Sequence, residues 1–208
     1  MELEINSELA ELIGILLGDG SINIYPSSKY STYYRLKISF HKQDCEYRDY
    51  VSKLIEKVLG VIPKEKLREF ENTAELLVFR KHILDALLQL GMKKSPKWNN
   101  AILPTDFMNP SLGKYVLKGY FDTDGSVVRT NNNGIIYPRL EMKICPSPMQ
   151  KQLIELLDSY GFKYGVHDIG RGKVRVQMNG KEQLRKWLDT IGFSNPKHLK
   201  RALVFTNN

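Results

Sequence analysis

One eleven-residue segment occurs twice in this chain and constrains its fold more than any other feature. "LIGILLGDGSI" (12–22) aligns with "LKGYFDTDGSV" (117–127) at an offset of 105 residues, which places Asp19 against Asp124. In both copies a helix-like run ends in an acid followed by glycine. A carboxylate in the last turn of a helix faces the negative end of the macrodipole, which costs roughly 0.3–1 kcal/mol. An acid placed there twice needs a compensating partner.

The similarity extends beyond this segment and indicates an internal duplication. Two further pairs of blocks recur in the same order: 36–60 with 139–161, and 76–97 with 174–197. We therefore expect two halves, 1–100 and 101–208, with a linker at about 93–110. The linker is expected to be ordered because it carries large apolar residues that need burial. These are Trp98, Ile102, Leu103 and Phe107.

Each half has the same predicted order of elements: helix, strand, strand, helix, strand, strand or turn, helix. The first helix is expected to start near Ser7, which suits an N-cap. Its counterpart starts near Asn109, and Pro110 suits the first helical position. This order predicts an α+β protein built from two related halves.

Three predicted strands, "YRLKISFH", "RLEMKIC" and "KVRVQMN", alternate polar and apolar residues. Period-2 alternation puts one face of a strand on the core and the other outside. The outward side chains are mostly of the kinds that contact phosphates and base edges. They are Arg35, Lys37, Ser39, His41, Arg139, Glu141, Lys143, Lys173, Arg175, Gln177 and Asn179. One such face is an ordinary solvated surface, but three of them favour a binding surface.

The composition points to an anionic partner. Thirty-one basic residues against 23 acidic ones give a net charge of +8 and a pI near 9.3, a balance that favours nucleic acid. No apolar run reaches the ~18 residues of a membrane span, and the acidic N-terminus does not resemble a targeting peptide. We expect an intracellular protein, in the cytoplasm of a prokaryote or inside an organelle. Cys45 and Cys145 lie outside any CxxC pair, so they are expected to be free thiols.

The repeated segments can build a metal site. Gly14 and Gly119 would let two helices approach closely, which brings Asp19 and Asp124 together at one end. Neighbouring carboxylates repel and raise each other's pKa, and Mg²⁺ binds through one or two carboxylates plus substrate phosphate. Metal ions beside a basic sheet suit phosphodiester hydrolysis. For one copy alone, Asp-Gly is better interpreted as a turn or helix cap, whereas two equivalent copies favour the site.

The two segments resemble the repeated motif of the LAGLIDADG homing endonucleases, in their single-chain form. "LIGILLGDG" and "LKGYFDTDG" match its apolar positions, its small third residue and its closing acid-Gly pair. The resemblance implies two pseudo-symmetric αββαββα halves packed through their motif helices, with antiparallel sheets forming a saddle over duplex DNA. It also implies a monomeric, intron-homing enzyme that cuts both strands of a long target with Mg²⁺, using two or more ions.

The resemblance assigns roles to individual residues. Asp19 and Asp124 match the metal-binding acids, and the backbone carbonyls of Gly18 and Thr123 match positions that can complete the coordination. The family often has Gln-Lys at the end of the second strand. His41 and Lys42 stand there in this chain, with Lys143 as the nearest counterpart in the second half. The family also places a lysine after the third helix, where Lys97 (or Lys94) and Lys197 lie.

Direct DNA contacts are expected from the outward strand faces and from the loops "YPSSKYSTYY" and "RTNNNGIIYP". The candidates are Asn23, Tyr25, Arg35, Lys37, Ser39, Arg129, Arg139, Glu141, Lys143, Lys173, Arg175 and Gln177.

Two alternatives remain open. An RNA maturase would bind host intron RNA and assist splicing with little or no cleavage, and it need not keep both acids; here both are present. A DNA-binding regulator would predict lost acids or an added helix-turn-helix. An intein is not expected, because the chain starts with Met1-Glu2, ends with Asn207-Asn208 and has no room for a splicing domain.

Overall fold

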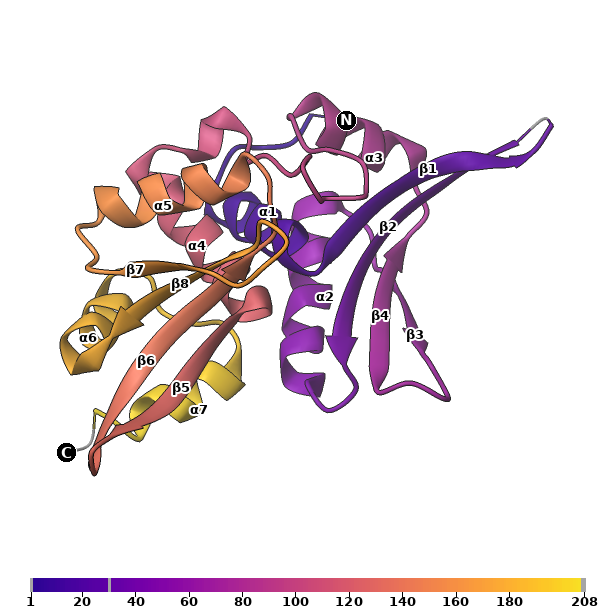
Figure 1. Cartoon of the computed structure of the whole chain (residues 1–208). Coiled ribbons are helices and arrows are strands. Elements are labelled where there is room, and N and C mark those ends of the chain that lie inside the picture. The colour runs from indigo at the N-terminus through magenta and orange to yellow at the C-terminus, as the bar shows by residue number, and fades with distance from the viewer. Residues whose placement is uncertain (1, 30, 207–208) are drawn as a thin grey trace.

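The computed structural model describes residues 2–29 and 31–206 (Figure 1). Met1, residue 30 of the first predicted loop and the terminal Asn207-Asn208 lie outside the described residues. The first half contains α1 (Ser7–Gly18), β1 (Gly20–Ser28), β2 (Ser31–His41), α2 (Cys45–Leu59), β3 (Lys64–Leu67), β4 (Thr73–Val78) and α3 (Lys81–Gln89). A 3-10 turn, η1 (Thr105–Phe107), follows. The second half contains α4 (Pro110–Asp124), β5 (Gly125–Asn132), β6 (Ile135–Ile144), α5 (Met149–Ser159), β7 (Gly165–Asp168), β8 (Val174–Asn179), α6 (Gly180–Thr190) and α7 (Pro196–Leu203).

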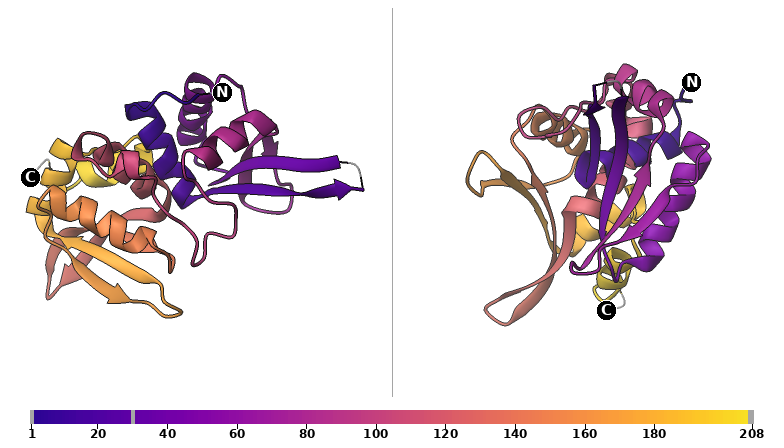
Figure 2. Two further views of the ribbon diagram at one scale, coloured as in Figure 1. Left: turned by 90° about the horizontal axis from the view of Figure 1, so that it is seen from above. Right: turned by 90° about the vertical axis from the view of Figure 1, so that its right-hand side faces the viewer.

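Two antiparallel sheets with the same topology confirm the predicted α+β fold. Their strand orders are β1-β2-β4-β3 and β5-β6-β8-β7. Leu36 lies opposite Val78 in the first sheet, and Leu140 lies opposite Met178 in the second; all four side chains are buried. The sheets flank the central helices α1 and α4, and the β1–β2 ribbon reaches far beyond the helices (Figures 1 and 2).

Helices α1 and α4 approach closely through the two motif glycines. A Cβ on Gly14 would overlap the carbonyl oxygen of Val116, and a Cβ on Gly119 would overlap that of Glu11. Any larger residue would push one helix off the other, because the atoms it meets belong to the main chain. The close approach predicted for these glycines is confirmed.

The starts of the motif helices follow ordinary capping chemistry. Asn6, and not Ser7, caps α1: its Oδ1 accepts a hydrogen bond from the Leu9 amide at 2.9 Å, and Ser7 is the first helical residue. Asn109 caps α4 in the same way, and Pro110 begins it, as predicted.

The segment between the halves is ordered around Leu103 and Phe107, both fully buried. Trp98 departs from the expectation of burial: it is 39% exposed, and the Lys173 ammonium lies 5.2 Å from its ring centre. Helix α7 was not predicted, because eight residues are too few for apolar periodicity to identify a helix. Within the described ranges, no helix is long and apolar enough to cross a bilayer.

Candidate active site

Asp19 and Asp124 lie at the adjacent ends of α1 and α4. Asp19 is the C-cap residue of α1, and Asp124 is the last residue of α4. A Cβ on Gly18 would lie 2.9 Å from the Thr123 Cβ and 3.4 Å from Oδ2 of Asp124. The ends of the two motif helices therefore touch, and the structure brings the four predicted metal-site residues together. The Thr123 hydroxyl bonds back to its own helix, at the carbonyl of Tyr120 (2.9 Å).

The surroundings disfavour the charged forms of both acids. Burial raises the pKa of Asp124 to about 7, with a further contribution from repulsion by Asp19. Desolvation at the helix ends also raises the pKa of Asp19, although Lys97 and Lys197 oppose the shift. A bound cation would reverse this penalty, because it favours the carboxylate forms.

The Lys97 side chain lies at the end of α1, next to the two acids. Its ammonium donates to the carbonyl of Leu17 at 2.9 Å and also to the carbonyl of Gly18. Burial lowers the Lys97 pKa, while Asp124 and Asp19 act in the opposite direction. The Gly18 carbonyl, which was predicted to bind a metal ion, therefore accepts a hydrogen bond from the positively charged Lys97 ammonium.

Lys197 has different surroundings. Its ammonium lies 3.3 Å from Oδ2 of Asp44, and its side chain is 44% exposed. Its charge nevertheless opposes the rise in the Asp19 pKa. The two lysines repeat in sequence, but Lys97 is half-buried against the end of α1, whereas Lys197 forms an ion pair with Asp44.

The side chains of His41 and Lys42 point in different directions and have different partners. His41 ends β2 with an exposed side chain, and its Nδ1 accepts from the Gln43 amide at 3.3 Å. The Lys42 ammonium donates to the Glu69 carbonyl at 3.4 Å, on the β3–β4 turn. The structure does not bring Lys42 to the acids, because successive residues at a strand end point to opposite sides.

The outward face of the first sheet carries the predicted polar residues. Arg35 lies opposite Asn23, and its Nη2 donates to the Asn23 Oδ1 at 3.3 Å. Lys37 is paired with the buried Glu75 at 3.4 Å, so part of its charge is neutralised. Ser39, Tyr25 and Lys37 share this face by strand parity.

On the second sheet, β6 and β8 present a row of charged and polar side chains. Arg139, Glu141 and Lys143 of β6 lie opposite Asn179, Gln177 and Arg175 of β8. Arg139 and Glu141 form an ion pair at 3.3 Å. Lys173 belongs to the turn before β8, contrary to the predicted strand.

Arg129, predicted as a DNA contact from the loop at 129–138, belongs to strand β5. It shares its side of β5 with the buried Val127, so it lies on the face opposite Arg139. There it lines a hollow with Arg201 and Phe205 of the C-terminal segment. Alternation from Val127 already places Arg129 on that side.

An open groove of about 690 Å³ joins the Asp124 end of α4 to the second sheet. Its lining includes Gly18, Lys97, Trp98, Asp124, Lys143, Cys145, Lys173 and Arg175. Basic side chains thus surround one acid of the pair, which suits a phosphate group.

Asp122 was not among the predicted site residues, although it is the sixth residue of "LKGYFDTDG" and matches the first Asp of the LAGLIDADG motif. It is buried, and its Oδ2 accepts from the amides of Ser194 (2.7 Å) and Asn195 (3.0 Å). Burial raises its pKa to about 8 in spite of these bonds. Leu17 stands at the equivalent position of the first half, so comparing the two copies was the signal that could have found it.

The duplicated halves, the closely packed motif helices and the two acids at their adjacent ends define a single-chain LAGLIDADG fold. The sequence model of the LAGLIDADG DNA endonuclease family matches residues 10–185, and the chain belongs to this family.

Two curated proteins match nearly the whole of this chain over a small part of their own length. A replication factor C small subunit of Methanocaldococcus jannaschii is 26% identical over 212 residues, covering 97% of this chain and 10% of that protein. A DNA polymerase of Thermococcus kodakarensis is 25% identical over 206 residues, covering 93% of this chain and 11% of that protein. This chain therefore spans about a tenth of the length of these relatives.

Two solved structures share the fold. The homing endonuclease I-DmoI in complex with DNA and Ca has a TM-score of 0.67 at 16% identity, over 97% of this chain and 98% of that chain. The LAGLIDADG meganuclease I-AabMI bound to uncleaved DNA has a TM-score of 0.66 at 13% identity, over 98% and 90%.

Proposed function

We propose that this chain is a sequence-specific homing endonuclease that makes Mg²⁺-dependent double-strand breaks in a long DNA target by phosphodiester hydrolysis. One observation carries the proposal: Asp19 and Asp124 lie at touching helix ends, next to the half-buried Lys97 and a basic groove. A structural turn needs neither a pair of acids nor a lysine close to both of them. Family membership supports the same activity.

The residues present fit a hard divalent cation. Two carboxylates and the Gly18 carbonyl form an oxygen-rich site, and the Lys97 ammonium on that carbonyl is a stand-in cation. Across residues 2–29 and 31–206, no group of three or more His, Cys, Asp or Glu side chains could hold a metal. Asp19 and Asp124 would therefore hold Mg²⁺ with main-chain, water and phosphate oxygens, as this ion prefers.

The chain itself supplies positioning and charge. When bound, Mg²⁺ supplies Lewis-acid stabilisation at the reacting phosphate and activates water for attack. Lys97 and Lys197 would stabilise the negative charge that develops on the phosphate oxygens. His41, the last residue of the inner strand β2, is the remaining candidate for ordering water near the acids.

DNA would lie across the outward faces of both sheets. Arg35, Lys37, Arg139, Lys143 and Arg175 are placed to contact phosphates or bases there. The halves 1–100 and 101–208 would each serve one side of the target, with 93–110 as linker. Because both halves are in one chain, we propose that it acts as a monomer.

Cleavage of a randomised duplex library with Mg²⁺ tests the proposal. The protein should cleave a subset of long sites, and Asp19→Asn or Asp124→Asn should abolish double-strand cleavage while DNA binding persists. Asp49→Asn, an exposed position on α2, makes the same charge change as a control and should cleave normally. Full cleavage by the double variant Asp19→Asn, Asp124→Asn would refute the assignment. Recovery of no cleaved site, with tight binding to a structured intron RNA, would indicate a maturase.

A further inference from the structure

The start of α7 is anchored to motif helix α4 through Asp122. Besides the two amides bound by its carboxylate, the Asp122 carbonyl accepts from Nδ2 of Asn195 at 3.0 Å. The Asn195 Oδ1 accepts in turn from the amide of Lys197 at 3.1 Å, as the cap of α7. A chain of hydrogen bonds therefore runs from Asp122 to the backbone of Lys197.

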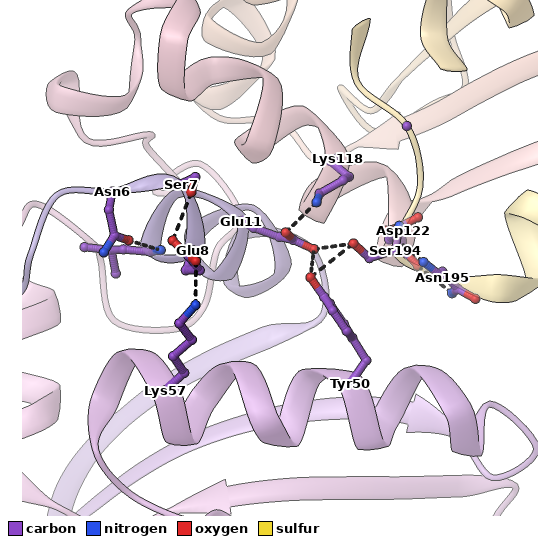
Figure 3. A network of polar contacts seen from close by, with 12 residues as sticks. Asn6, Ser7, Glu8, Glu11, Tyr50, Lys57, Lys118, Asp122, Ser194 and Asn195 are labelled. Carbon is purple, nitrogen blue, oxygen red and sulfur yellow. Dashed lines mark hydrogen bonds and ion pairs between the residues drawn. The ribbon is translucent and has the colours of Figure 1, made fainter. Parts of the chain in front are cut away.

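The same segment is also fixed to the first half (Figure 3). The Ser194 hydroxyl donates to Oε1 of Glu11 at 2.7 Å, and the Tyr50 hydroxyl donates to the same oxygen at 2.8 Å. The other Glu11 oxygen pairs with the Lys118 ammonium at 2.6 Å. Both motif helices thus hold the residues that precede Lys197.

In the first half, the lysine that corresponds to Lys197 is held in a different way. Leu17 is the counterpart of Asp122, and its carbonyl accepts directly from the Lys97 ammonium at 2.9 Å. The equivalent carbonyl of Asp122 binds Asn195 instead. Lys97 is therefore held by its ammonium, whereas Lys197 is held by its backbone and keeps its ammonium at the surface near Asp44.

Packing alone does not explain an acid at position 122. Oδ1 of Asp122 is buried without a hydrogen-bond partner among the described residues. Such a group costs free energy that an apolar side chain avoids, and Leu17 shows that the motif accepts one.

We propose that Asp122, acting through Asn195, is a positioning residue for Lys197, so that it supports cleavage of one DNA strand and not of the other. The inference rests on the proposed endonuclease function. Lys97 and Lys197 belong to different halves and line different hollows, Lys97 with Asp124 and Lys197 with Asp44, so each would serve its own scissile phosphate. Loss of the anchor would displace one lysine and leave the other in place.

The test uses the wild-type chain to select a cleaved duplex from the randomised library, then labels its two strands with different dyes. Asp122→Leu copies the residue of the first half. It should slow cleavage of one strand by about 10–100-fold, the usual cost of losing a residue that orients a functional group, and leave the other strand unchanged. Asp122→Asn keeps an acceptor oxygen and should restore most of the lost rate. Gln183→Leu is the matched control, because Gln183 is buried and its Oε1 accepts from the Lys163 amide, away from α7.

Two further variants test whether the effect of Asp122→Leu acts through Asn195 and Lys197. Asn195→Ala breaks the same link without burying a new side chain, so it should give the same strand bias even if Asp122→Leu folds poorly. In a Lys197→Met background, Asp122→Leu should cause no additional loss on the affected strand. Equal slowing of both strands, or additive losses in the double variant, would overturn the inference. If the wild-type chain cleaves no duplex, the proposed function fails instead.

Discussion

Replacing Gly119 by alanine should separate the motif helices and the acids at their ends. A Cβ there would lie 3.0 Å from the Ile15 amide nitrogen and would overlap the Glu11 carbonyl oxygen. An ordinary contact begins at 3.4 Å, so the nitrogen alone requires a shift of 0.4 Å and the oxygen a larger one. The clashing atoms are main chain in a buried helix and cannot rotate away.

The magnitude follows from two opposing effects. Overpacking a core costs about 1–3 kcal/mol, and this site belongs at the upper end because backbone meets backbone. Alanine in place of glycine returns about 1 kcal/mol of helix propensity. We expect a net loss of about 2 kcal/mol in the free energy of unfolding. Cleavage should fall by up to about 10²-fold if the acids move apart by about 1 Å.

Urea unfolding and cleavage of the selected duplex measure both effects. Gly113→Ala is the matched control in the same helix, because its Cβ would meet the methyl groups of Leu156, which can move. Gly113→Ala should lose less stability and keep its cleavage rate. A Gly119→Ala protein as stable and as active as wild type would refute the reasoning.

Three further outcomes are expected. The logarithm of the DNA-binding constant should fall with the logarithm of the salt concentration, with a slope of about −0.9 per phosphate neutralised, and Arg175→Ala should reduce the size of that slope by about one. A DNA affinity that does not change with salt would argue against the basic sheet face. Lys97→Met should strengthen Mg²⁺ binding to DNA-free protein several-fold in calorimetry, because it frees the Gly18 carbonyl, whereas Lys197→Met should not. Burial, with repulsion from Lys197, lowers the His198 pKa to about 4. At this group the unfolded chain therefore binds more protons between pH 6.5 and 4, so the His198 contribution to stability should fall by about 2 kcal/mol from pH 7 to pH 5. Urea melts measure it as the difference between wild type and His198→Phe, because Asp122 and Asp124, whose pKa values are raised, act in the opposite direction in both proteins.

Much of the fold could be predicted from local pattern. The glycine and acid spacing of "LIGILLGDGSI" and its repeat at 117–127 specified two helices that pack and end in carboxylates. Period-2 alternation placed Arg35 and Arg139 on outward faces, and consistent use of the same parity would have placed Arg129 on the other side. These features depend on neighbours within a few residues, so the sequence contains them directly.

The surroundings of the repeated lysines were decided only by tertiary structure. Lys97 and Lys197 both follow Pro in matching blocks, yet one donates to Leu17 and the other pairs with Asp44. Asp122 and Asn195 are 73 residues apart along the chain, and the bond between them exists only after α7 packs against α4. Local sequence sets which way a side chain points from its own helix or strand. Which distant group it meets depends on how whole elements pack, and a buried acid such as Asp122 acquires its partner and its raised pKa at that stage.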